Sequence, residues 1–312
     1  MMNLKRQITF ISYFIVIQIS FGQDAKITGT KLIDSYLSNG EFVRADSALQ
    51  QQIARLKSQQ LTDSLIDYIY YIGKVKLKLS NTSQATKAVT EFTDGIKAST
   101  VKPRLLRQLY LELGSFYNLI GNPQKAYESN LTALDYTVKI KNATGEDFGL
   151  VHSNMGTYAK YIGNLHLALQ HHRKALKYYE SWPGTEKSSL YITYNSLGGM
   201  MWFSSKIDSA LYYYKLAGSV LKELPQTPLN KYFRPAMLNN NIAAIYGSQG
   251  NMEKAMQSMK STINNWISFL NSEASDDKKE SGKNAYYQAI ENYAGLYKDL
   301  GDYQKAKDLL SY

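Results

Sequence analysis

Apolar and small residues recur along this chain as pairs of amphipathic stretches, each pair joined by a short polar turn. An alanine marks the same place in every pair, at intervals of 40, 41, 42, 42, 45 and 51 residues: Ala45, Ala85, Ala126, Ala168, Ala210, Ala255 and Ala306. A near-constant period of this size is typical of stacked supersecondary units that bury their apolar faces against one another. The pattern therefore predicts a repeat protein.

The turn within each pair has a regular composition. Five residues before the alanine stands a glycine or serine, usually followed by a polar residue, as in Gly121-Asn122 and Gly163-Asn164. Glycine followed by asparagine is a helix stop and a helix start in succession. Twelve residues before the alanine a small residue allows two helices to cross closely: Gly73, Gly114, Gly156, Gly198, Ala243 and Ala294. Each repeat is predicted to be two antiparallel helices.

Two segments carry the clearest form of the pattern, LGSFYNLIGNPQKA at 113–126 and MGTYAKYIGNLHLA at 155–168. With these motifs the chain resembles the tetratricopeptide repeat (TPR) family over roughly residues 26–312, although the spacing exceeds the family's usual ~34 residues. The longer period is similar to that of kinesin-light-chain-like repeats. The resemblance implies an all-α fold, a right-handed superhelical solenoid of helix-turn-helix repeats.

The repeat pattern divides residues 23–312 into about seven units, the last of them incomplete. Their approximate ranges are 26–60, 66–100, 107–142, 149–182, 191–224, 236–270 and 287–312. Proline-rich residues 225–235 and the polar stretch 271–284 lengthen two of the links. Both are predicted to be surface loops.

Residues 1–22 have the composition of a signal peptide. Lys5 and Arg6 precede an apolar run from Ile8 to Ile19, and Ser20-Phe21-Gly22 places small residues before a cleavage point near Gly22/Gln23. The run is shorter than the roughly 20 apolar residues of a spanning helix, so no transmembrane span is predicted in this segment. The chain has no cysteine. We predict an exported bacterial protein, periplasmic or extracellular.

Composition offers little sign of chemistry. The net charge is +10, but the lysines do not form a stripe, so nucleic acid is not expected as a partner. Of the four histidines, His172 falls at a position where a packed core imidazole is expected, and His166 and His171 lack the spacing of zinc ligands. No nucleophile motif or phosphate-binding loop is present. We expect no catalytic residue, metal or cofactor within the 312 residues.

The resemblance implies that the first helix of each repeat lines a concave groove. Amide side chains recur there, and an amide can pair with both groups of a ligand peptide bond. The candidate peptide-groove residues are Asn154, Lys160, Asn195, Trp202, Asn240, Asn241, Asn292 and Lys298. In an alternative interpretation the asparagines only cap or bridge neighbouring helices.

These features predict a non-catalytic scaffold that binds a protein or peptide partner outside the cytoplasm. One alternative is the amino-terminal sensor region of a longer CHAT-type protease or TPR sensor kinase, which exported repeats of this spacing resemble. A weaker alternative is a secreted glycan- or matrix-binding protein that uses the tyrosines Tyr212 to Tyr214. Because Tyr312 falls within a second helix, we expect a chain that continues or an uncapped last repeat that self-associates.

Overall fold

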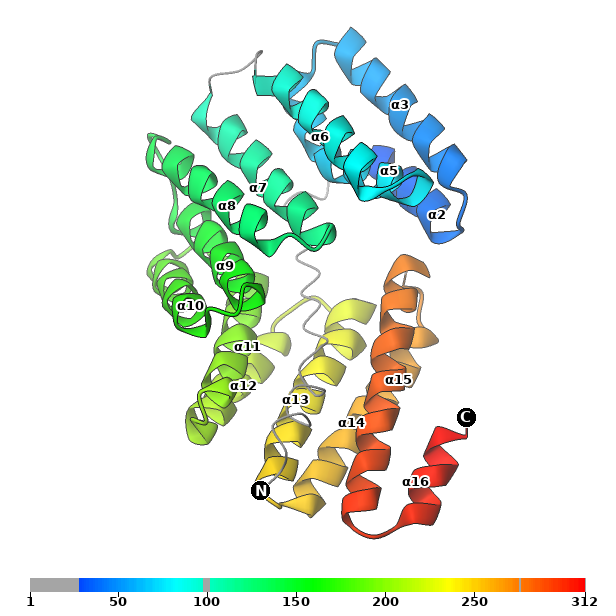
Figure 1. Cartoon of the computed structure of the whole chain (residues 1–312). Coiled ribbons are helices and arrows are strands. Elements are labelled where there is room, and N and C mark those ends of the chain that lie inside the picture. Colours follow the sequence, from blue (N-terminus) through cyan, green and yellow to red (C-terminus); the bar gives the residue numbers. More distant parts are fainter. Residues whose placement is uncertain (1–27, 98–101, 275, 312) are drawn as a thin grey trace. The chain divides into compact units, whose positions relative to one another are not determined.

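The computed structural model describes residues 28–97, 102–274 and 276–311, and the secondary structure that it assigns there is helical (Figure 1). The predicted signal peptide lies outside these residues. The described chain forms two compact units, Ala25–Met200 and Met201–Tyr312, which divide within one helix. The predicted all-α helical-repeat fold is confirmed.

The first unit is a succession of antiparallel helix pairs. Its elements are α2 (Thr28–Ser38), α3 (Phe42–Ser58), α4 (Thr62–Leu65), the 3₁₀ turn η1 (Ile66–Tyr68), α5 (Ile69–Leu79), α6 (Thr82–Lys97), α7 (Pro103–Leu119), α8 (Pro123–Val138), α9 (Gly145–Tyr161), α10 (Leu165–Ser181) and most of α11 (Lys187–Phe203). Helices α7 and α8 pack side by side, as do α9 and α10, and α8 also contacts α9 (Figure 1). The two helices of a repeat thus pack against each other.

The second unit continues the same scheme. Its elements are α12 (Ile207–Leu221), the π-helical turn η2 (Leu229–Phe233), α13 (Arg234–Ser248), α14 (Met252–Leu270), α15 (Asp276–Asp299) and α16 (Tyr303–Leu310). The alanines that define the repeat are fully buried in both units, each with 0% of its surface exposed. Buried apolar faces of consecutive helices therefore form the core, as the period predicts.

Both predicted loops are wrong in part, because each contains helix. Within 225–235, η2 runs directly into α13, since Phe233 is held by ring contacts to Trp266 and Phe269 at centroid distances of 4.9 and 5.1 Å. Within 271–284, α15 begins at Asp276, and Gly282 lies close against Phe269. Polar composition did not distinguish a solvated helical turn from a loop.

The predicted turns between the two helices of a repeat are confirmed by backbone conformation. Five glycines adopt a left-handed conformation, with φ between +73° and +90°: Gly40, Gly121, Gly163, Gly250 and Gly301. After three of them an asparagine caps the next helix, as where Asn164 Oδ1 accepts from the Leu167 N–H at 3.0 Å. Glycine permits this turn because it has no Cβ to clash.

Ser205 occupies the glycine position of its repeat with a φ of +56°, which a side chain disfavours by about 1–2 kcal/mol. We expect Ser205→Gly to raise the free energy of unfolding by about 0.5–1 kcal/mol, measured by urea denaturation. Ser80 is the matched control, since it holds the same repeat position with a φ of −142°. Ser80→Gly should destabilise, and a gain of equal size there would show that backbone strain is not the cause.

Small residues at the helix crossings make room for the second helix of the same repeat. A Cβ on Gly156 would stand 2.9 Å from the His172 ring, so the partner of this glycine is His172, one turn beyond the repeat alanine Ala168. A Cβ on Gly114 would likewise collide with the Asn130 amide. The close crossing was predicted correctly, and its polar partners were not.

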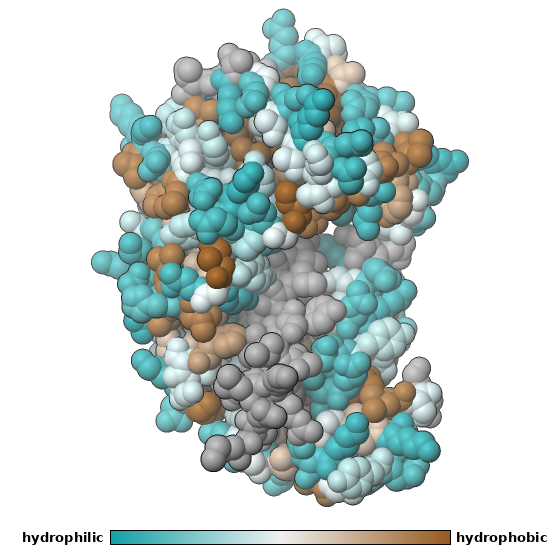
Figure 2. All heavy atoms as spheres, in the orientation of Figure 1, coloured by the Kyte–Doolittle hydropathy of each residue, from teal (hydrophilic) through white to brown (hydrophobic). Residues whose placement is uncertain are grey.

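Apolar residues on the face shown in Figure 2 lie in small groups between polar ones. Among the described residues, no helix is both long and apolar enough to cross a bilayer.

Candidate functional site

The eight candidate groove residues fall in both units. Asn154, Lys160 and Asn195 belong to Ala25–Met200, and the other five belong to Met201–Tyr312. Asn154, Asn241 and Asn292 are buried, Lys298 is exposed, and the remaining four are half-buried: Lys160, Asn195, Trp202 and Asn240. The candidate residues therefore form two sets, one in each unit.

In the second unit two of the asparagines bridge helices. Asn292 Nδ2 on α15 donates to Asn240 Oδ1 on α13 at 3.4 Å, and Gln288 Nε2 donates to Asn292 Oδ1 at 3.4 Å. The Asn292–Asn240 bond joins first helices of successive repeats, as the bridging interpretation expects, and the Gln288–Asn292 bond lies within α15. Trp202 lies 6.3 Å from Phe203 between ring centroids.

In the first unit Asn154 differs from that bridged pair. Its side chain on α9 is 6% exposed, and the buried Oδ1 has no hydrogen-bond partner among the described residues. A buried acceptor without a donor costs free energy comparable to a lost hydrogen bond. Asn154 therefore has an unused hydrogen-bonding capacity.

Lys160 stands near the end of the same helix. Its Nζ lies over the Tyr161 ring, 4.7 Å from the centroid, and burial lowers the pKa of the ammonium to about 8. The Tyr161 side chain is 39% exposed. An aromatic ring and a partly desolvated amine thus occupy the carboxyl end of α9, where they can contact a partner.

Several polar side chains that the sequence analysis missed lie on first helices of the same unit. Gln108 Nε2 on α7 donates to Asp67 Oδ1 at 2.8 Å, and Tyr71 on α5 donates to Asp34 Oδ2 at 2.9 Å. Burial, with Asp67 nearby, raises the pKa of the Glu112 carboxyl to about 8. Counting repeat positions from the recurring alanines would have found two of them, because Tyr71 and Glu112, like Asn154, each stand 14 residues before the alanine of their repeat.

Three histidines form a buried cluster between α9 and α10. His152 Nδ1 lies 3.1 Å from His171 Nδ1, and the Tyr127 hydroxyl lies 3.0 Å from His171 Nε2. His172, as predicted, is a core imidazole with 1% exposure. Burial is the main cause that lowers the pKa values of His152 and His171 to about 4 and that of His172 to about 3. The three rings are therefore neutral at pH 7.

No group of three potential ligand side chains that could hold a metal occurs in the part of the chain that the structure describes. The two histidine nitrogens that face each other can share one proton as a hydrogen bond, which suits packing. The cluster is thus best explained as core structure.

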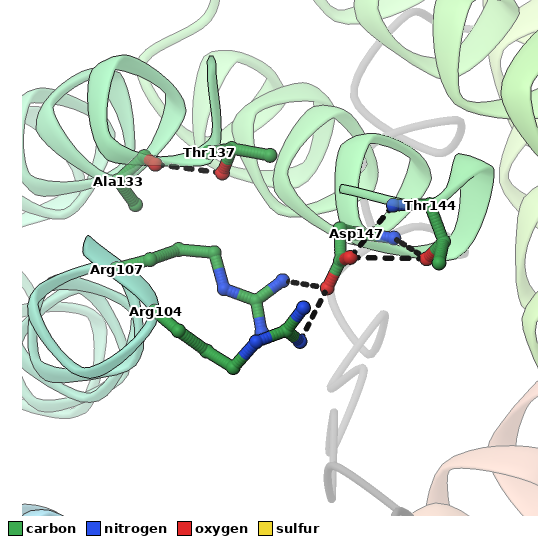
Figure 3. A network of polar contacts seen from close by, with 6 residues as sticks. All are labelled: Arg104, Arg107, Ala133, Thr137, Thr144 and Asp147. Carbon is green, nitrogen blue, oxygen red and sulfur yellow. Dashed lines mark hydrogen bonds and ion pairs between the residues drawn. The ribbon is translucent and has the colours of Figure 1, made fainter. Parts of the chain in front are cut away.

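A second polar network, around Asp147, is structural as well (Figure 3). The Asp147 carboxylate pairs with Arg107 and, at 3.7 Å, with Arg104, and its Oδ2 accepts the Thr144 N–H at 2.8 Å. Burial opposes ionisation, but the Thr144 bonds and both arginines outweigh it and hold the pKa of Asp147 below its usual value. Asp147 also completes the capping box that starts α9, so this network joins α7 to α9.

Comparisons with known proteins agree with this architecture. The family model described as "Tetratricopeptide repeat" matches residues 238–261, which span the turn between α13 and α14. BtubC (BKLC) from P. vanneervenii is similar in structure, with a TM-score of 0.60 and 17% identity, over 76% of this chain and 94% of that chain. No curated protein matches the sequence.

Two further solved structures are similar over most of the chain. The apo form of RapI has a TM-score of 0.57 and 14% identity, over 90% of this chain and 74% of that chain. The apo form of the quorum sensor NprR from B. thuringiensis has the same TM-score and identity, over 90% of this chain and 73% of that chain. NprR in complex with its cognate peptide NprX matches with a TM-score of 0.51 and 14% identity, over 87% of this chain and 76% of that chain. The chain thus has the fold of a tetratricopeptide-type helical repeat protein.

Proposed function

We propose that this chain is a scaffold that binds a peptide or protein partner through first-helix side chains of the Ala25–Met200 unit. The observation that carries the proposal is the buried, unpaired Oδ1 of Asn154. An extended peptide supplies backbone N–H donors at regular spacing, and one of them would satisfy this acceptor. Lys160 and Tyr161 would contact the same ligand further along α9.

The structural likeness to NprR supports peptide binding as the function of this chain. That protein has been seen with its cognate peptide NprX. In this chain polar side chains, among them Tyr71, Gln108 and Asn154, recur on the first helices of the Ala25–Met200 unit, where we expect such a peptide to lie. Export from the cytoplasm, and an effector domain beyond Tyr312, stay predictions from the sequence.

The glycan-binding alternative has less support. Tyr212 is exposed, but Tyr214 is fully buried in the core, so the tyrosine triplet does not form one binding surface. Tyr212 and Tyr213 meet edge to face at 5.5 Å.

A selection from a random peptide library displayed on phage tests the proposal. Peptides selected on the wild-type chain should bind Asn154→Ala about 10-fold more weakly, because one buried hydrogen bond to the peptide is lost. Binding is measured by fluorescence anisotropy of the labelled peptides. Asn142→Ala is the matched control, since Asn142 is exposed in the turn between α8 and α9. Selected peptides that bind Asn154→Ala as tightly as wild type would contradict the proposed site.

A further inference from the structure

The turn between α2 and α3 differs in its chemistry from the other turns that a left-handed glycine makes. Gly40 holds the glycine position there, and the residue before it is Asn39. The four other left-handed glycines follow residues without a short side-chain amide: Ile120, Ile162, Gln249 and Leu300. No other asparagine in the sequence precedes a glycine. This turn therefore joins a side-chain amide to a backbone nitrogen that no Cβ shields.

The Asn39 side chain is exposed and extends toward the residues that follow it. Its Nδ2 lies 3.5 Å from Glu41 Oε1, two residues further along the chain, so the amide group points in the direction of Gly40. Gly40 is exposed as well, and a Cβ built on it would meet no atom within 4 Å. The surroundings of this pair therefore leave room for water and for a small ring.

Two backbone hydrogen bonds close the turn. The Gly40 N–H donates to the Leu37 carbonyl at 3.3 Å. The Glu41 N–H donates to the Tyr36 carbonyl at 2.9 Å, which completes the pair of bonds that ends a helix at a left-handed glycine. The bond of Gly40 is long for an N–H···O bond, and bonds in exposed turns open at a small cost in free energy. The Gly40 nitrogen can thus be released while the core stays folded.

We propose that Asn39 is a site of spontaneous deamidation, a property independent of the proposed peptide binding. The Gly40 nitrogen forms a bond to Asn39 Cγ and gives up its proton, which leaves with the side-chain amide nitrogen as ammonia. A cyclic imide results, and water opens it. Cleavage of the new bond to Cγ gives aspartate. Cleavage of the original peptide bond gives isoaspartate, in which the backbone runs through Cβ and Cγ, so that either product consumes one water and releases one ammonia.

The isoaspartate product changes the backbone of the turn as well as its charge. It inserts one additional atom into the main chain before Gly40, and this moves the two N–H donors of the turn away from their carbonyls. Ile33 and Leu37 of α2 belong to the same core cluster as Ala45 of α3, and the turn sets how the two helices meet. Loss of the turn bonds should therefore loosen α2. The aspartate product keeps the normal backbone and should leave the turn closed.

Incubation of the folded chain at mildly alkaline pH, followed by peptide mapping with mass spectrometry, tests the reaction. Asn39 should deamidate about 10-fold faster than Asn271 or more, because a side chain on the following residue hinders ring closure. Asn271 is the matched comparison within the same chain. It too is exposed and follows the last residue of a helix, but Ser272 comes next in place of a glycine.

Asn39→Gln is the matched variant for the same experiment. It keeps the side-chain amide but places it one methylene further from the backbone, so position 39 should stay unmodified while Asn271 behaves as in wild type. A synthetic peptide of residues 35–44 shows the reaction without the fold. Equal rates at Asn39 and Asn271 in the folded chain would overturn the proposal. Reaction in the peptide alone would also overturn it, because the closed turn would then protect Asn39.

Hydrogen exchange of the α2 amides tests the structural consequence. The isoaspartate form is separated by ion exchange and recognised by electron-transfer fragmentation, and its α2 amides should exchange about 10-fold faster than those of wild type. Asn39→Asp carries the same charge on a normal backbone and should exchange as wild type does. Exchange of the isoaspartate form at the wild-type rate would show that α2 is not loosened. Equally fast exchange in Asn39→Asp would assign the loosening to the charge beside Glu41 and contradict the backbone explanation.

Discussion

Trp266→Ala is expected to lower the free energy of unfolding of the Met201–Tyr312 unit by about 3–5 kcal/mol. Trp266 is 1% exposed on α14, and its indole meets the rings of Phe233 and Phe269 edge to face, at centroid distances of 4.9 and 6.1 Å. Removal of the indole leaves a cavity that two aromatic rings from η2 and α14 cannot fill without shifting. The loss is measured by urea denaturation followed by far-UV circular dichroism.

The next residue on the same helix provides the control. Ile267 is 43% exposed, so Ile267→Ala should change stability by less than about 0.5 kcal/mol. Trp266→Phe, which keeps a ring in the cluster, should cost less than Trp266→Ala. Equal losses for Trp266→Ala and Ile267→Ala would mean that the aromatic cluster does not hold the unit together.

In a repeat protein such a loss need not spread along the whole chain. Each repeat contacts mainly its neighbours, so stability is nearly a sum over repeats and their interfaces. The chain divides into the two compact units within α11, and unfolding of one can precede that of the other. A biphasic denaturation curve, with only one phase shifted by Trp266→Ala, is the corresponding expectation.

The sequence predicted those features of the fold that depend on local chemistry. Alanine at the helix crossings and glycine in the turns both have one physical reason, the lack of bulk or of a Cβ, and so recur at fixed spacing. The structure places Ala168 in the core and Gly163 in a left-handed turn accordingly. The beginning of α15 was missed because charged residues suit a solvated helix as well as they suit a loop.

The candidate site was less predictable, because its contacts join residues that are distant in the sequence. Asp67 and Gln108 are 41 residues apart, and Asn240 and Asn292 are 52 apart. Repeat positions give the height of a side chain on the stack, but not whether it bonds to its neighbour or remains unpaired. Thus Asn154 and Asn292 were equivalent in the sequence, whereas the structure shows an unpaired acceptor in one and a helix bridge in the other.

Acidification is expected to destabilise the first unit through its buried histidines. In the folded chain the pKa values of His152 and His171 are about 4 and that of His172 is about 3, against an ordinary value of 6.5. The unfolded chain therefore takes up protons first as the pH falls. The stability that neutral histidines provide is complete above pH 6.5 and is lost progressively between about pH 6.5 and pH 3.

At about pH 5, protonation of each histidine in the unfolded chain should lower the free energy of unfolding by about 2 kcal/mol. The loss is smaller where His152 and His171 share a proton. Urea denaturation at about pH 7.5 and about pH 5 measures this difference. His152→Phe keeps the ring that stacks on Tyr178 at 5.6 Å and removes the proton site, so it should reduce the loss on acidification. His166→Gln, at an exposed position on α10, should leave the loss unchanged. If His152→Phe loses as much stability as wild type, acid acts on this unit through groups other than the histidine cluster.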